Sequence, residues 1–249
     1  MTHNGDLTFK PFLLMRLSFI FFILLLFLNC ESTQSKKKSE PTNLQVKPIQ
    51  EQIVTPNSNK KTEREFPVLT EKNAMDFFLE YEKHNKENKV RMTTDFGVFE
   101  ILLFDKTKFH RANFIFLTKQ GYFNDTQFYR VINNYIVQAG NSDDKKTAVK
   151  RRKIGKYLLP TDTKRGYKHD RGVISMPSSE LENPHKLASP YEFFIVQQRG
   201  GAHFLNGDYT IFGKVTKGMN VIDKIAAVST DNADCPLQNI YIRKVEIIN

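Results

Sequence analysis

The chain has 249 residues and a formal net charge of +10, with 40% hydrophobic residues, 21 phenylalanines, two cysteines and no tryptophan. Its apolar content excludes a wholly disordered chain, its two cysteines exclude a disulfide scaffold, and its 12 glycines exclude a collagen-like chain. Because only one stretch is long and apolar, a multi-span membrane protein is excluded as well.

The first 29 residues are predicted to be a signal peptide. Residues 17–28 form the apolar run LSFIFFILLLFL, which has the length of a signal-peptide core and is short of the ~20 residues that a spanning helix needs. Met15 and Arg16 stand just before it, so translation starts at either Met1 or Met15. Cys30 follows the run and resembles the lipidated cysteine of a bacterial lipoprotein.

Three alternatives stay open for this segment. Cys30 is lipidated and anchors the chain to a lipid bilayer, or the apolar run remains as an uncleaved anchor, or the chain is secreted without an anchor. All three place the body of the protein outside the cytoplasm, and we expect a membrane-anchored lipoprotein of the cell envelope that faces the periplasm or the exterior. Cys235 is then the only free thiol, so the fold must rely on its core rather than on an internal disulfide.

Residues 30–66 are polar and lack apolar periodicity, which predicts a lipid-anchored, disordered tether. Residues 67–89 are predicted to hold a helix that Thr70 caps and that runs to about Asn88. Its expected apolar stripe consists of Met75, Phe78, Leu79 and Tyr81. We expect this stripe to pack on the domain that follows.

Residues 90–249 are predicted to form one domain with a sizeable core. Strand patterns cover residues 90–94, 98–104, 127–132, 136–139, 172–176, 191–197, 209–215 and 240–248, and helical patterns cover 109–120 and 219–228. Many short strands with only two helices favour a mainly β architecture, a closed antiparallel barrel.

Four segments of this domain carry distinctive sequences in a fixed order. They are FYRVINNYIVQAG at 128–140, RGVISM at 171–176, EFFI at 192–195 and FLNGDYTIFGKV at 204–215. Together with HRANF at 110–114, they resemble the cyclophilin family over about residues 90–249. The resemblance implies an eight-stranded barrel capped by two helices, peptidyl-prolyl cis–trans isomerase activity, and no cofactor.

The chemistry of that reaction needs few groups. Amide resonance gives the X-Pro bond a rotation barrier of roughly 18–20 kcal/mol, and twisting localises the lone pair on the prolyl nitrogen. A catalyst therefore needs a donor aimed at this nitrogen and a surface that holds the ring while the amide turns. Because no nucleophile, acid–base pair or metal is required, we expect no cofactor and no metal site.

Arg130 is the candidate donor, because a guanidinium is always charged and offers a fixed fork of N–H groups. If residues 133–135 form a three-residue turn, Ile132 pairs with Ile136 and Arg130 pairs with Gln138. Gln138 is then expected to hold Arg130 by a side-chain hydrogen bond. A two-residue turn would place Val137 opposite Arg130 instead.

The resemblance also implies the walls of a proline pocket. The expected substrate-binding residues are Tyr135, Ile136, Met176, Glu192, Phe194, Phe204 and Leu205, with Tyr209 at the rim. Several positions depart from the family pattern: Tyr129, Pro177-Ser178, Tyr191-Glu192, Phe204 and Tyr209. Of these, Glu192 is expected to reach Arg130 and pull the guanidinium from the substrate, which would lower catalytic efficiency.

Residues 143–171 form a basic insert, with eleven lysines and arginines against four aspartates. Its peak is KRRK at 150–153. The insert is a solvated loop, a patch that steers acidic clients, or a surface that rests on anionic lipid. Nucleic acid is not an expected partner of an exported protein.

The expected function is therefore a peptidyl-prolyl cis–trans isomerase of the cell envelope that accelerates X-Pro isomerisation in exported or folding proteins. Its expected partners are polypeptide clients that contain X-Pro and the lipid bilayer that holds its anchor, and we expect a monomer. One alternative is a proline-peptide binding or holdase lipoprotein with weak or no catalysis. Another is a structural envelope lipoprotein whose basic insert docks an acidic partner. No Gly-x-Ser-x-Gly sequence supports a hydrolase.

Overall fold

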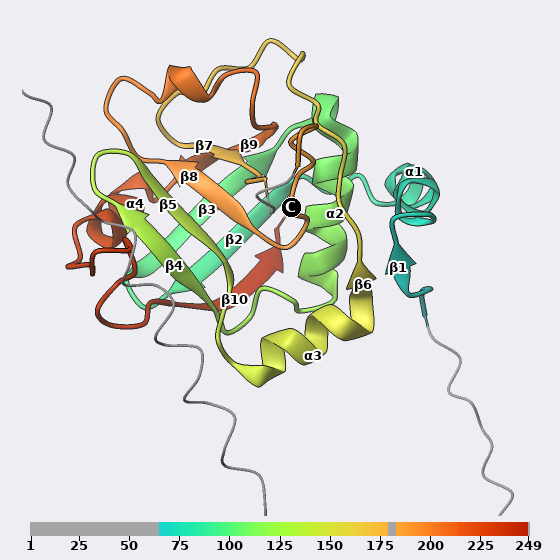
Figure 1. The fold of residues 1–249 in the computed structure, drawn as a ribbon, viewed down its shortest axis with the longest axis horizontal. Coiled ribbons are helices and arrows are strands. Elements are labelled where there is room, and N and C mark those ends of the chain that lie inside the picture. Colours follow the sequence, from blue (N-terminus) through green and yellow to red (C-terminus); the bar gives the residue numbers. More distant parts are fainter. Residues whose placement is uncertain (1–64, 179–182, 249) are drawn as a thin grey trace, which may run out of the picture. The chain divides into compact units, whose positions relative to one another are not determined.

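The computed structural model describes residues 65–178 and 183–248 (Figure 1). The predicted signal peptide, the lipidation site Cys30 and nearly all of the predicted tether lie outside the described residues. Within the described part of the chain, no helix is long and apolar enough to cross a membrane.

Eight strands close into an antiparallel barrel, which confirms the predicted fold class (Figure 1). They are β2 (Lys89–Thr94), β3 (Gly97–Leu103), β4 (Thr126–Ile132), β5 (Ile136–Asn141), β7 (Val173–Ser175), β8 (Phe193–Val196), β9 (Ile211–Lys217) and β10 (Tyr241–Ile247). Their order is β10-β2-β3-β9-β7-β8-β5-β4, and β10 pairs with β4 to close the ring.

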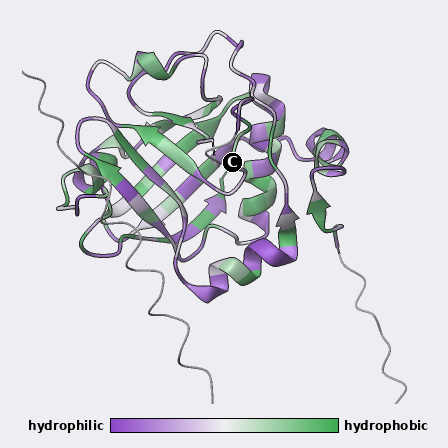
Figure 2. Ribbon diagram, in the orientation of Figure 1, coloured by the Kyte–Doolittle hydropathy of each residue, from purple (hydrophilic) through white to green (hydrophobic). Residues whose placement is uncertain are grey.

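The period-two pattern that predicted these strands follows from burial. In β2 and β3, buried residues alternate with partly exposed ones, so one face of each strand lines the core and the other faces outward (Figure 2). β8 is buried at all four positions and therefore reads as a continuous apolar run. The many phenylalanines fill the core; Phe114, for example, packs on Phe123, Phe193 and Phe212.

The two predicted helices of the domain are present as α2 (Lys108–Lys119) and α4 (Met219–Ala226). Two short 3-10 helices, η1 (Asp105–Thr107) and η2 (His203–Leu205), lie in the connections. Nine consecutive residues of α2, 110–118, are buried. The helix is covered on both sides, because it contacts α1 as well as β9 and β10 of the barrel.

The N-terminal helix is shorter than predicted. α1 spans Ala74–His84, with Asn73 at its N-cap position, and Thr70 belongs to a short strand, β1 (Leu69–Thr70). The Asn73 side chain accepts a hydrogen bond from the backbone N–H of Thr70 at 2.7 Å, so Thr70 does not cap the helix. Leu79 is 44% exposed rather than packed. The rings that pack on Phe116 of α2 are Phe77, Phe78 and Tyr81.

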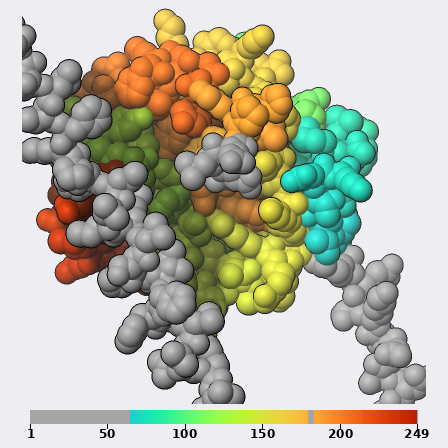
Figure 3. Space-filling view, viewed as in Figure 1, coloured from blue at the N-terminus to red at the C-terminus, as the bar shows by residue number. Residues whose placement is uncertain are grey.

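The basic insert, for which the sequence indicates no helix, contains a third helix of the domain, α3 (Lys145–Ile154). Its high charge hides any apolar stripe, but Asp144 caps it by accepting a hydrogen bond from the Lys146 N–H at 2.8 Å. The next strand, β6 (Gly155–Lys156), pairs in parallel with β1. The first described residues therefore lie beside β6, the strand that directly follows α3 (Figure 3).

Gly155 permits this pairing, and its replacement tests whether the N-terminal segment is held there. A Cβ at Gly155 would lie 1.9 Å from the Leu69 carbonyl oxygen, and its φ of +137° is unfavourable for other residues. Gly155→Ala should separate β1 from β6 and speed amide hydrogen exchange in β1 and α1 by about 10-fold or more. Gly166→Ala is the control, because Gly166 has φ +81° but open space around it. Equal exchange in both variants would show that the pairing does not hold the segment.

Candidate active site

The hairpin of β4 and β5 has the register of a three-residue turn. Ile132 pairs with Ile136, and Arg130 lies opposite Gln138. Asn134 in the turn adopts φ +54°, a left-handed conformation that asparagine tolerates better than most residues. The register therefore places Arg130 and Gln138 on the same face of the sheet.

Arg130 and Gln138 line a cavity of about 180 Å³. The other residues around it are Tyr135, Ile136, Pro177, Ser178, Phe194, Leu205 and Tyr209. The structure thus brings together seven of the ten residues predicted for the catalytic and substrate-binding set. A single cation therefore lies beside a wall that includes the buried apolar side chains of Ile136, Phe194 and Leu205.

Met176 and Phe204 do not line this cavity. Met176 is 1% exposed and belongs to the main barrel core, because the strand alternation turns it inward. Phe204 is 68% exposed and stacks on Tyr135 with the ring centroids 5.5 Å apart. It therefore supports the outer side of Tyr135 rather than covering the cavity.

Gln138 does not hold Arg130, contrary to the prediction. Its amide nitrogen donates to the hydroxyl of Tyr129, and that hydroxyl in turn donates to Glu192 at 3.2 Å. Burial raises the pKa of Tyr129, so the phenol stays protonated and can donate. Tyr129 thus fixes the orientation of Gln138.

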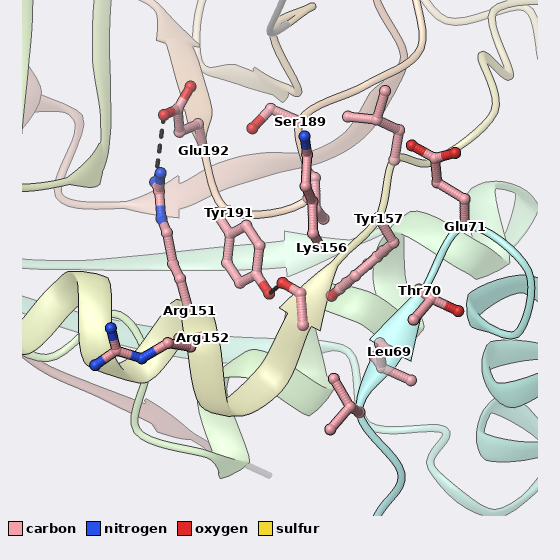
Figure 4. A pocket seen from close by; sticks show the side chains of 14 residues that line it. Leu69, Thr70, Glu71, Arg151, Arg152, Lys156, Tyr157, Ser189, Tyr191 and Glu192 are labelled. Atoms are coloured by element: carbon pink, nitrogen blue, oxygen red, sulfur yellow. Dashed lines mark hydrogen bonds and ion pairs between the residues drawn. The ribbon is translucent and has the colours of Figure 1, made fainter.

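Glu192 does not pair with Arg130 either. Its carboxylate accepts hydrogen bonds from Asn141 at 3.1 Å and from Arg151 of α3 at 3.3 Å (Figure 4). These partners come from the end of β5 and from the basic insert. The expected loss of efficiency through a Glu192–Arg130 pair therefore has no basis in the structure.

The partner of Arg130 is Asp234, which the sequence reading missed. Both Nε and Nη2 of Arg130 lie 3.3 Å from the Asp234 Oδ2. The loop that carries Asp234 is tied to β4, since the Val131 N–H donates to the Asp234 carbonyl at 2.8 Å. Both side chains of the pair are about two-fifths exposed, so the pair contributes little to stability but orients the guanidinium.

Phe194, a wall of the cavity, is supported from behind by His169. The two rings are nearly parallel, with an interplanar angle of 11° and centroids 6.0 Å apart. Nδ1 of His169 lies 2.9 Å from Oδ1 of Asn206 and Nε2 lies 3.0 Å from Oγ of Ser175. Because Asn206 Oδ1 only accepts, the neutral ring carries its proton on Nδ1. No local sequence signal pointed to this role.

No group of three or more histidine, cysteine, aspartate or glutamate residues is placed to hold a metal ion in the described ranges. The one cysteine there, Cys235, is exposed and free.

His169 predicts how stability depends on pH. Burial lowers its pKa, so the unfolded chain binds the proton more readily than the folded chain. The contribution of His169 to the free energy of unfolding is therefore complete above the ordinary histidine pKa of ~6.5, and it is lost as the pH falls through that value. In urea unfolding at pH 7.5 and 5.5, His169→Gln should show a smaller decrease in the free energy of unfolding than the wild type. His84→Gln, at an exposed position on α1, is the control, and an unchanged slope in His169→Gln would contradict the assignment.

The comparisons with known proteins agree with this geometry. The family model described as cyclophilin type peptidyl-prolyl cis-trans isomerase/CLD matches residues 89–247. Peptidyl-prolyl cis-trans isomerase-like 2 of Rhizopus delemar is 35% identical over 169 residues, which cover 67% of this chain but only 30% of that protein. A peptidyl-prolyl cis-trans isomerase of Acinetobacter baylyi is 33% identical over 172 residues, which cover 64% of this chain and 84% of that protein.

A solved structure of a cyclophilin type isomerase has a similar fold. The crystal structure of a cyclophilin type peptidyl-prolyl cis-trans isomerase of Cryptosporidium parvum matches with a TM-score of 0.55 at 27% identity, and the match covers 66% of this chain and 98% of that one. The family match spans the whole barrel, including both sides of the cavity that holds Arg130. The chain therefore belongs to the cyclophilin-type family of peptidyl-prolyl cis–trans isomerases.

Proposed function

We propose that Arg130 stabilises the twisted X-Pro amide while the apolar residues of the cavity beside it hold the prolyl ring. The supporting observation is the position of one cation at the edge of a cavity of about 180 Å³ walled by Ile136, Phe194 and Leu205, each less than a tenth exposed. As the amide turns, its lone pair localises on the prolyl nitrogen. An N–H of Arg130 then donates to that nitrogen, an interaction that is weaker in the planar ground state.

Asp234 is proposed to set the direction of the guanidinium. It occupies Nε and Nη2 of Arg130, which leaves Nη1 for the substrate. Because the fork is planar, holding one edge fixes the plane of the whole group. Gln138, held by Tyr129, lines the same cavity and offers its amide oxygen to the substrate backbone.

We place this activity in the cell envelope, as a membrane-anchored lipoprotein whose clients are exported polypeptides that contain X-Pro. The support is the apolar run at 17–28 followed by Cys30. The isomerase domain is proposed to act as a monomer. A globomycin-sensitive shift in mass of the expressed chain, absent in Cys30→Ala, would support lipidation; an unlipidated Cys30 would contradict it.

The alternative of a binding or holdase protein without turnover was motivated by Glu192 and Phe204, and Phe204 stacks on Tyr135 without lining the cavity. Since Glu192 binds Arg151 and Asn141, Arg130 is not diverted by it. Catalysis is therefore the function that the geometry favours.

Replacing Arg130 tests the proposed mechanism. Arg130→Ala should lower kcat/KM for an X-Pro peptide by about 10²-fold or more, the usual loss for one electrostatic donor. NMR exchange spectroscopy measures this without a coupled protease. Arg130→Lys, which keeps the charge but not the planar fork, should recover only part of the loss. An alanine variant as fast as the wild type would remove Arg130 from the mechanism.

Replacing Asp234 tests its positioning role. Asp234→Ala should lower kcat/KM about 3- to 10-fold, since one hydrogen bond to a charged group orients the guanidinium. Asp234→Asn keeps an acceptor oxygen and should stay close to the wild type. Faster turnover in the alanine variant would mean that Asp234 holds Arg130 away from the substrate.

A further inference from the structure

The outward side of α3 carries a set of basic residues that the isomerase reaction does not use. Lys145, Lys146, Arg152 and Lys156 are exposed, and Val149, 37% exposed, lies among them. Spacings of four and three residues place Lys145, Val149 and Arg152 in one row along the helix, and Lys156 follows in β6. We call these five residues the basic face of α3.

The opposite side of α3 is occupied by contacts within the domain. Lys150 donates to the carbonyls of Gly121, Tyr122 and Asn124, at 3.1, 3.3 and 2.6 Å. Arg151 donates to the Tyr122 hydroxyl at 2.8 Å and binds Glu192. These contacts fix the rotation of the helix about its axis, so the basic face must point outward.

The charges of the basic face are not balanced within the domain. In the described ranges, no acidic side chain forms an ion pair with Lys145, Lys146, Arg152 or Lys156, whereas many other basic residues of the chain are paired. The helix dipole accounts for Arg152 near the C-terminus of α3 but disfavours Lys145 and Lys146 in the first turn. Their presence there points to a partner outside the domain.

The surface beside α3 is hollowed. A cavity of about 610 Å³ lies between β1, β6 and the segment before β8, and Arg152 and Lys156 lie on its rim (Figure 4). Glu71 is the acidic residue on the same rim, and Glu192 is already bound to Arg151. Its lining also includes the rings of Tyr157 and Tyr191.

The chain enters the domain next to this face. β1 begins four residues after Glu65, the first described residue, and pairs with β6 directly after α3. The 64 preceding residues, which include the apolar run at 17–28, therefore join the domain beside the basic face. Any surface that binds that run is brought close to α3 at high effective concentration.

We propose that the basic face of α3 docks the isomerase domain on an anionic lipid surface. The lysines and arginine contact the phosphate groups, and Val149 reaches the interfacial layer. Each basic residue close to such a surface strengthens binding by about fivefold. Docking would hold α3 against the bilayer. Because α3 packs on the domain through Lys150 and Arg151, the whole domain would take one orientation on the surface.

The absence of tryptophan from the chain allows a direct test. Val149→Trp introduces a single tryptophan into the full chain, which is reconstituted with vesicles of phosphatidylcholine alone or with about 30% phosphatidylglycerol. We expect a blue-shifted emission and quenching by brominated lipid only with phosphatidylglycerol, and both should disappear near 0.5 M salt because screening shortens the range of the attraction. Leu237→Trp, at a 67% exposed position before β10, should not respond to lipid charge.

Charge-reversal variants distinguish lipid binding by the basic face from a general effect of the net charge. In the Val149→Trp background, Lys145→Glu with Arg152→Glu should lower the salt-sensitive binding at least 25-fold. The matched control is Lys164→Glu with Lys168→Glu, which changes the charge equally at exposed positions outside α3 and should behave like its parent. An emission that is the same in both vesicle types, or that shifts with polyglutamate but not with phosphatidylglycerol, would overturn the proposal. Isomerase activity is measured separately, so failure here leaves the proposed function untouched.

Discussion

The pairing of β4 with β5 is the constraint on which the site depends. Side chains alternate along a strand, so a slip of one residue would turn Arg130 to the opposite face and remove it from the cavity. The turn at 133–135 prevents that slip, with Asn134 in a left-handed conformation. The hydrogen bond from Val131 to the Asp234 carbonyl then places a carboxylate beside the guanidinium. The backbone register therefore determines that Arg130 faces the cavity, and the side-chain contacts only adjust its orientation.

Features that repeat within a few residues could be predicted from the sequence. The eight strands follow from period-two burial, and α2 and α4 follow from their apolar stripes and the glycines at their ends. α3 could not be found in this way, because only Thr147 and Ile154 of the helix are buried and its other contacts with the domain are made by Lys150 and Arg151. Long basic side chains that bury their stems and bond to the domain leave no apolar pattern to detect.

Partners of long polar side chains were the least predictable part of the site. Strand alternation placed Gln138 and Glu192 on definite faces, but each has several acceptors or donors within reach. Tyr129 and Arg151 bind them, and neither Gln138 nor Glu192 binds Arg130. Asp234 lies 104 residues from Arg130 in the chain, so no local spacing could reveal it. The apolar walls were easier, since Ile136, Phe194 and Leu205 belong to segments that the family resemblance already aligned.

The basic insert and the N-terminal segment are connected with each other and with the barrel. Gly155 lets β1 approach β6, and Arg151 of α3 binds Glu192, two residues before the cavity wall Phe194 in the same segment. The contact fixes α3 relative to the strand that lines the active site. The side of α3 that faces the domain contacts Tyr122, Glu192 and the carbonyls after α2. The opposite side of the helix is left exposed. What α3 binds with its outer side can therefore orient the catalytic cavity without occupying it.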